Sequence, residues 1–112
     1  MSRTVVKIKS NDIKKDNEII LEQLAREDYE LKEKNGEQFY QNGVGLIVAP
    51  KFIKYYIEGD IITLEAWVRN FAFGGESSLD GFVGSLPKKQ VKDLLNIIQL
   101  SVSGDVIETY KK

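Results

Sequence analysis

The side chains that carry most familiar enzyme chemistry are missing from this sequence of 112 residues, which contains no histidine and no cysteine. Without them the chain cannot build a Ser-His-Asp triad, a Cys-His pair or an ordinary zinc site. Two acids in a glycine-rich segment, Glu76 and Asp80, are the best carboxylate candidates for a hard cation. Their spacing does not match a calcium-binding loop. We therefore predict no metal site, no cofactor, no catalytic residues and no enzyme activity.

A second candidate site lies where a glycine-rich connection, residues 74–89, leads into a predicted helix. Backbone N–H groups at a helix N-terminus attract anions, and nearby lysines add positive charge. The residues that would bind are Gly84, Ser85, Lys88 and Lys89. Their order is not that of a Walker motif. Small-molecule or anion binding is therefore an alternative hypothesis, set against the simpler interpretation of turn glycines and solvated lysines.

Aromatic and charged side chains share one face of a predicted hairpin, residues 52–69. Phe52, Tyr56 and Trp67 project there beside Arg69. Such rings combine a large contact area with a polar handle, as binding surfaces require. Our leading hypothesis is a non-enzymatic protein-interaction or binding module that uses these four residues, with an unknown protein or a second copy of the chain as its partner. The competing interpretation is that the N-terminal segment, the 70–86 connection or the C-terminal tail covers the rings.

Two helices are predicted from apolar side chains at helical spacing. The first begins after Asn11 or Asp12, either of which can cap it, and runs to about residue 26. Its stripe comprises Ile13, Ile20, Leu21, Leu24 and Ala25. The second begins near Ser85, has Pro87 in its first turn and stops before Gly104. Its stripe comprises Val91, Leu94, Leu95, Ile98 and Val102.

Two tight turns predict two hairpins. Asn35-Gly36 suits a two-residue turn with positive φ at both positions, and Gly59-Asp60 suits a turn with glycine first. Counting outward from the second turn pairs Phe52 with Trp67 and Lys54 with Glu65. A slip of one residue would bury these charges, so the pattern fixes the register. One core face results, comprising Ile53, Tyr55, Ile57, Ile62, Leu64, Ala66 and Val68.

The remaining segments predict smaller features. Residues 4–9 fit a first strand, and Gly43 with Gly45 suggests a bulge or bend. A short strand at 81–84 fits the glycine-rich connection. The segment 103–112 is either a flexible tail or an edge strand.

Composition is that of one ordinary globular domain spanning residues 1–112, with 42% hydrophobic and 29% charged residues. A formal net charge of −1 gives no broad basic field, so nucleic acid is not an expected partner. No apolar stretch approaches the roughly 20 residues that span a bilayer, and the N-terminus alternates like a strand and unlike a signal peptide. We expect a cytoplasmic protein without a membrane partner.

The predicted elements follow the order β-α-β-β-β-β-α and give an α+β fold, in which a curved antiparallel sheet carries two helices on one face. This order is similar to that of the half-domain of the TATA-binding protein. Likeness of element order implies nothing about function.

The segment from Gly43 to Asn70 and the segment from Leu79 to Leu95 also resemble an uncharacterised bacterial domain that occurs in small proteins with a zinc ribbon. The hairpin ending in Leu64-Glu65-Ala66-Trp67 and the segment 81–89 carry the resemblance, which covers residues 4–102. It implies no activity and no site residues. The cysteines of the ribbon are absent from this chain.

Overall fold

The computed structural model describes residues 2–43, 50–69, 75–80 and 85–112, with Ser85 described by its backbone alone. Its elements are, in chain order, β1 Thr4–Lys9, α1 Ile13–Arg26, β2 Glu30–Lys34, β3 Glu37–Asn42, β4 Lys51–Glu58, β5 Ile61–Arg69, β6 Glu76–Ser77, α2 Ser85–Ser101 and β7 Asp105–Lys111. The predicted α+β class is confirmed.

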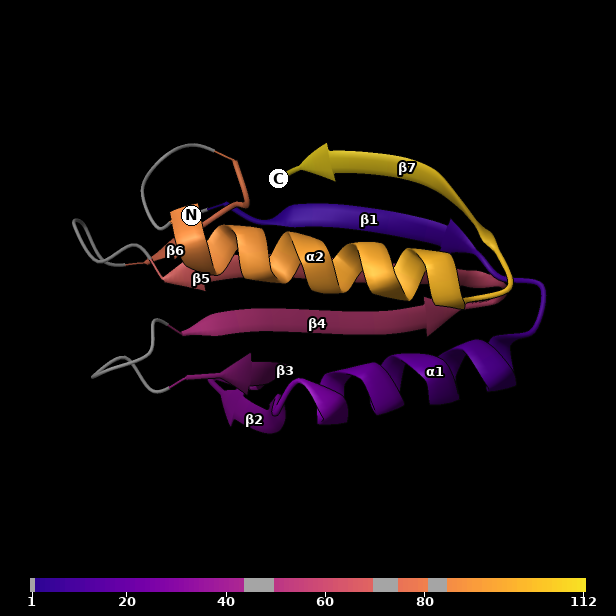
Figure 1. Cartoon of the computed structure of the whole chain (residues 1–112), viewed down its shortest axis with the longest axis horizontal. Helices are drawn as coiled ribbons and strands as arrows, with labels where there is room; N and C mark the ends of the chain where they lie inside the picture. The colour runs from indigo at the N-terminus through magenta and orange to yellow at the C-terminus, as the bar shows by residue number, and fades with distance from the viewer. Residues whose placement is uncertain (1, 44–49, 70–74, 81–84) are drawn as a thin grey trace.

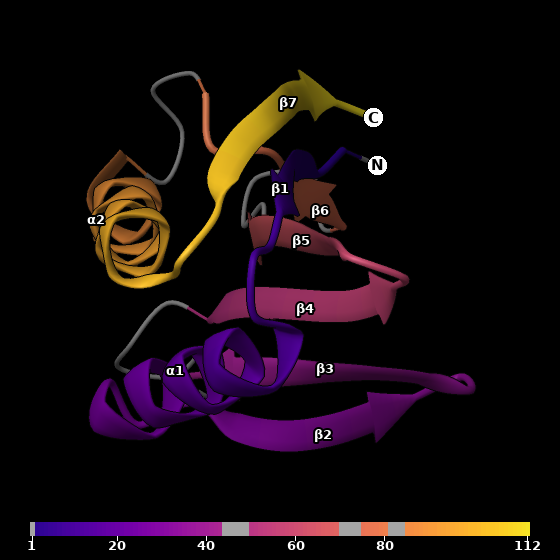
Figure 2. The same ribbon diagram turned by 90° about the vertical axis from the view of Figure 1, so that its right-hand side faces the viewer.

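One open sheet organises the chain, and all of its strand pairs are antiparallel. The strands follow the order β2-β3-β4-β5-β1-β7, visible from bottom to top in Figure 2. The two-residue strand β6 pairs with the end of β5, just beyond the point where β1 begins. The strands β3, β4, β5 and β1 therefore each have a neighbour on both sides, and β2 and β7 are the edges.

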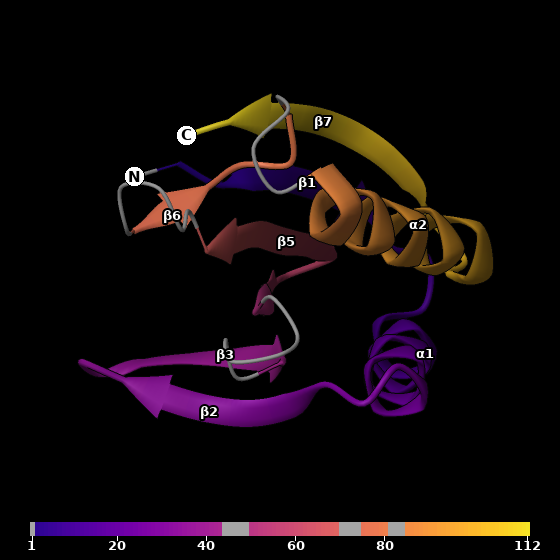
Figure 3. The same ribbon diagram turned by 60° about the vertical axis from the view of Figure 1, so that its left-hand side comes forward.

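Both helices pack against the same face of the sheet (Figures 1 and 3). The core between them contains Ile20 and Leu24 of α1 together with Val91 and Ile98 of α2. These side chains meet Ile8, Ile53, Ile62 and Leu64 from the sheet, all fully buried. The amphipathic stripes are confirmed except at the outer edge of α1, where Leu21 and Ala25 are exposed because that flank turns away from the strands.

The register counted for the second hairpin is confirmed, and the first hairpin forms at the predicted turn. In the second hairpin, Phe52 lies opposite Trp67 and Lys54 opposite Glu65, as counted from the turn. In the first hairpin, Asn35 and Gly36 have φ of 54° and 79°, the left-handed conformations that the two-residue turn requires. Local turn chemistry and alternation were sufficient to fix these pairings.

Two strands were not part of the predicted order. Segment 103–112 adopts the edge-strand alternative as β7, which pairs with β1 through an irregularity between Lys7 and Ile8. The strand β6 lies within the connection expected to be loop. The strand β7 owes its position to pairing with β1, far away in the sequence, whereas β6 folds back onto the end of the preceding strand β5. The strand expected at 81–84 and the glycine at 45 lie outside the described residues, whereas Gly43 has φ of 92°.

The buried carboxylate of Asp16 holds the end of β1 and the start of β7 beside the first turn of α1. It accepts hydrogen bonds from the Ser10 hydroxyl and from the amide and hydroxyl of Ser103, the latter two at 2.8 Å. Burial raises the pKa of Asp16, but these hydrogen bonds outweigh burial and hold its pKa below the ordinary value. Gly104 follows directly, where a Cβ would lie 1.9 Å from the carbonyl oxygen of Lys9. Asp16 thus joins the start of α1 to the connection between α2 and β7.

Replacing Asp16 by alanine should destabilise the protein by about 3 kcal/mol, because it removes a charged acceptor and leaves buried donors without a partner. Asp12→Ala is the matched control. Asp12 caps α1 through the amide of Lys15 at 3.2 Å, and its loss should cost about 1 kcal/mol. Urea unfolding followed by circular dichroism gives both values. Equal losses for the two variants would contradict the role assigned to Asp16.

Candidate functional site

Three aromatic side chains form a compact cluster on the sheet face that the helices leave uncovered. Phe39, Phe52 and Trp67 come from the adjacent strands β3, β4 and β5. The rings of Phe52 and Trp67 stack at 5.4 Å with an interplanar angle of 10°, and Phe39 meets both edge-on at 5.6 and 6.0 Å. Both arrangements are favourable for aromatic pairs. We call these three residues the aromatic cluster.

Arg3, in the N-terminal segment, covers the Trp67 ring of the aromatic cluster. Its guanidinium carbon lies 3.7 Å from the centre of the Trp67 ring, in cation–π geometry. The backbone of Arg3 also exchanges two hydrogen bonds with Lys112, at 3.0 and 3.1 Å, which extends the β1–β7 ladder to the end of the chain. The position of Arg3 over the indole is therefore fixed by its backbone as well as by its side chain.

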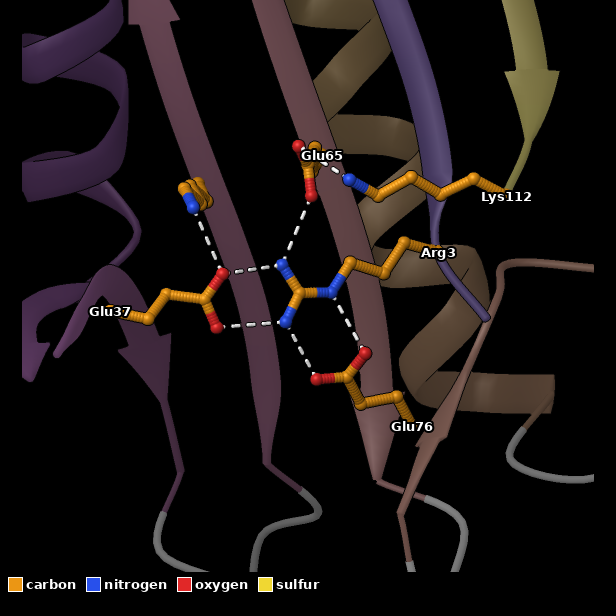
Figure 4. A network of polar contacts seen from close by, with 6 residues as sticks. Arg3, Glu37, Glu65, Glu76 and Lys112 are labelled. Atoms are coloured by element: carbon orange, nitrogen blue, oxygen red, sulfur yellow. Dashed lines mark hydrogen bonds and ion pairs between the residues drawn. The ribbon is translucent and has the colours of Figure 1, made fainter. Parts of the chain in front are cut away.

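All five N–H donors of the Arg3 guanidinium bond to carboxylates (Figure 4). Glu37 and Glu76 each accept two bonds, at 2.7 to 2.9 Å, and Glu65 accepts one at 3.0 Å. Two lysines complete the network, since Lys54 contacts Glu37 at 2.9 Å and Lys112 contacts Glu65 at 3.1 Å. Three cations thus balance three carboxylates, and we call these six residues the Arg3 network.

Two members of the Arg3 network, Arg3 and Glu37, have shifted pKa values. Hydrogen bonds from Arg3 lower the pKa of Glu37 to about 2, against the opposing effect of burial and with further help from Lys54. The hydrogen bonds to Glu76, joined by those to Glu37 and Glu65, outweigh burial and raise the pKa of Arg3. Arg3 and Glu37 are therefore both charged at neutral pH.

A groove of about 400 Å³ opens above the aromatic cluster. Its walls come from the β2–β3 hairpin on one side and from β5 and β6 on the other. The lining residues are Arg3, Lys34, Asn35, Glu37, Phe39, Gln41, Phe52, Trp67, Arg69, Gly75 and Glu76. A smaller hollow of about 270 Å³ lies beside Leu31 and Tyr55, and Lys54 is the member of the Arg3 network that lines it. The groove is the better candidate site.

The structure brings together part of the predicted aromatic face. Phe52 and Trp67 lie side by side in the groove, but they are 7% and 3% exposed. Arg69 lines the same groove and is exposed. Tyr56 does not line it. Although Tyr56 projects from the same face, it lies four residues further along β4 and is 38% exposed.

The N-terminal segment covers Trp67 through Arg3, and the other two segments bond to Arg3. Arg3 belongs to the N-terminal segment, Glu76 to the 70–86 connection and Lys112 to the C-terminal tail. Neither Arg3 nor Phe39 was predicted from the sequence to belong to a site. In the register of the first hairpin, Phe39 and Tyr40 point to opposite faces of the sheet. This alternation could have placed Phe39 on the face of Phe52 and Trp67. No feature of the sequence around Arg3 indicates its contacts with the distant carboxylates.

The residues of the alternative anion site are engaged elsewhere. Lys88 is buried and donates to the backbone carbonyl of Asp80, whereas Lys89 is exposed and pairs with Asp93 at 2.9 Å. Gly84 and the side chain of Ser85 lie outside the described residues. The two lysines therefore do not converge on one point.

The acids considered for a metal are also separated. Glu76 binds Arg3, and Asp80 bonds to Ser78 and Lys111. In the part of the chain that the structure describes, no three acidic side chains gather into a group that could hold a metal ion.

Lys51 is a buried lysine that the sequence analysis did not single out. It lies beneath α2, where its ammonium donates to the side-chain oxygen of Gln90 at 3.0 Å. Burial lowers the pKa of Lys51. It faces the helices and is absent from the groove.

No known protein family matches this chain. Comparison with curated proteins and with solved structures likewise gives no significant match. Among the described helices, none combines the length and apolarity needed to cross a membrane.

The stability of the protein should fall as the pH is lowered from about 4.5 to about 2. Glu37 has a folded pKa of about 2, below its ordinary value of 4.5, so it stabilises the folded state above pH 4.5 and loses this contribution as it becomes protonated. Urea midpoints between pH 2 and 6 measure the effect. Glu37→Gln should flatten the acid dependence, and Glu58→Gln, at an exposed strand end, should keep the wild-type slope. An unchanged slope in Glu37→Gln would contradict the assignment.

Proposed function

We propose that this chain is a cytoplasmic, non-enzymatic binding module that uses the groove above the aromatic cluster. The observation that carries the proposal is the groove itself. Its volume falls within the roughly 300 to 1,000 Å³ typical of ligand sites, and it combines an aromatic floor with a few convergent polar groups. Its partner is a segment of another protein or of a second copy of this chain. In the second case the protein forms a homodimer in solution.

The floor of the groove is rigid, which favours binding. Phe39, Phe52 and Trp67 project from paired strands, and the Arg3 network joins β3, β5 and β6 around them. Side chains held on strands and by hydrogen bonds lose little conformational freedom when a partner binds. The exposed groove residues, Arg69 and Lys34 among them, are then left to contact the partner.

The chemistry of the groove supports binding over catalysis. A general base works best with a pKa near the operating pH, and Glu37 has a pKa of about 2. Glu65 and Glu76 each form an ion pair with Arg3. These carboxylates are committed to structure, so we propose no catalytic role for them. Lys88 bonds to Asp80 and Lys89 pairs with Asp93, so no contact of these lysines favours the alternative anion site.

Two relationships remain proposals as well. The first is that the order of helices and strands corresponds to that of the TATA-binding-protein half-domain, with β6 and β7 as additional strands. The second is the resemblance to the bacterial domain found beside zinc ribbons. Neither supplies a function, so the proposal depends on the groove alone.

Small neutral aromatic probes test the groove directly. Phenol and indole should shift amide resonances of the groove residues and the indole N–H of Trp67 in ¹⁵N-edited spectra. Gln41→Trp, which fills the groove from β3, should weaken these shifts at least severalfold. Gln38→Trp is the control, since it places the same ring on the opposite face of β3.

Two results would refute the proposal. One is the absence of any shift at groove residues at millimolar probe. The other is equal binding by the wild type and Gln41→Trp. Sedimentation of the same samples shows whether the partner is a second copy of the chain.

A further inference from the structure

The groove has an excess of positive charge that its own residues do not neutralise. Glu37 and Glu76 are held by Arg3, and the Arg3 network as a whole is neutral. Two further cations line the groove, Arg69 and Lys34. Neither forms an ion pair with any carboxylate that the structure describes, and the segments outside the description contain no Asp or Glu. A bound partner would therefore meet an electropositive rim.

Arg69 is the cation best placed to act together with the aromatic cluster. It is the last residue of β5 and follows Trp67 by two positions, so the two side chains project from the same face. Its cross-strand neighbour, Glu76, has both oxygens occupied by Arg3. The planar fork of an arginine binds a carboxylate through two parallel hydrogen bonds. Lys34 stands at the far end of the groove, beside the β2–β3 turn.

We propose, on the basis of the proposed function, that the groove binds a peptide segment that presents an aromatic side chain beside a free carboxylate. The ring packs against the parts of Phe39 and Phe52 that line the groove, and the carboxylate pairs with Arg69. The aromatic floor selects the ring, because edge-to-face and offset contacts favour an aromatic group over an aliphatic one of similar size. The charge of Arg69 selects the acid.

Other partner chemistries fit the groove less well. A basic segment would approach Arg69 and Lys34 without an acid available to receive it, because Arg3 engages the acids of the groove. A nucleic acid needs a wide basic surface, whereas the chain has a net charge of −1. The groove thus favours an acidic, aromatic partner.

Three matched probes test the inference. N-acetyl-phenylalanine carries the ring and the carboxylate, N-acetyl-phenylalaninamide lacks the negative charge, and N-acetyl-leucine lacks the ring. Titration followed by the groove resonances gives a Kd for each probe. We expect the acid to bind roughly tenfold tighter than the amide, as one charge-assisted pair allows. The acid should also bind severalfold tighter than N-acetyl-leucine.

Variants assign the preference to Arg69. Arg69→Gln should bring the acid and the amide to the same Kd while leaving the Kd of the amide unchanged. Lys34→Gln removes the same charge at the far end of the groove and should keep most of the preference. Lys89→Gln, on the exposed side of α2, controls for net charge and should bind like the wild type. Melting temperatures verify that each variant is folded.

Each negative outcome refutes a different statement. Equal Kd values for the acid and the amide would overturn the carboxylate preference and leave the groove as a binding site. Equal Kd values for the acid and N-acetyl-leucine would overturn the aromatic preference. Failure of every probe to shift a groove resonance would refute the proposed function itself.

Discussion

The helix-free face of this protein depends on the interaction of a single guanidinium with three carboxylates and one indole. Arg3 lies next to the N-terminus, yet it contacts Glu37 of β3, Glu65 of β5 and Glu76 of β6, and it stacks on Trp67. A buried ion pair stabilises only if its geometry and hydrogen bonds compensate for desolvation. Here every guanidinium donor is used, and no buried side-chain nitrogen or oxygen among the described residues lacks a partner.

The two faces of the sheet therefore achieve stability by different means. The face under α1 and α2 is a conventional apolar core, in which residues such as Ile53 and Leu64 are excluded from water. Neither α1 nor α2 covers the opposite face, where Arg3 and its salt-bridge network lie over Trp67. A polar cover leaves a groove with ordered, charged walls. The groove, and with it the proposed binding function, is a consequence of stabilising this face with a polar network.

The sequence predicted the features that depend on local chemistry. Both helices, both turns and the full register of the β4–β5 hairpin follow from spacing and alternation. A slip of one residue would turn Lys54 and Glu65 toward the apolar core under the helices. The Arg3 network was not predictable in this way, since its bonds join residues 34, 62 and 73 positions apart. Lys88 illustrates the same limit. Its partner is the backbone carbonyl of Asp80, which the pattern of side chains in the sequence does not reveal.

The central claim is that Arg3 and its carboxylates act as one unit, and a double-mutant cycle tests this most directly. The unfolding free energies of the wild type, Arg3→Met, Glu76→Gln and the double variant give the coupling between the two side chains. Residues in one salt-bridge network couple by about 0.5 to 3 kcal/mol, and two charge-assisted hydrogen bonds place this pair near 2 kcal/mol. Losses that add to within about 0.3 kcal/mol would show that the two residues act independently and would contradict the account.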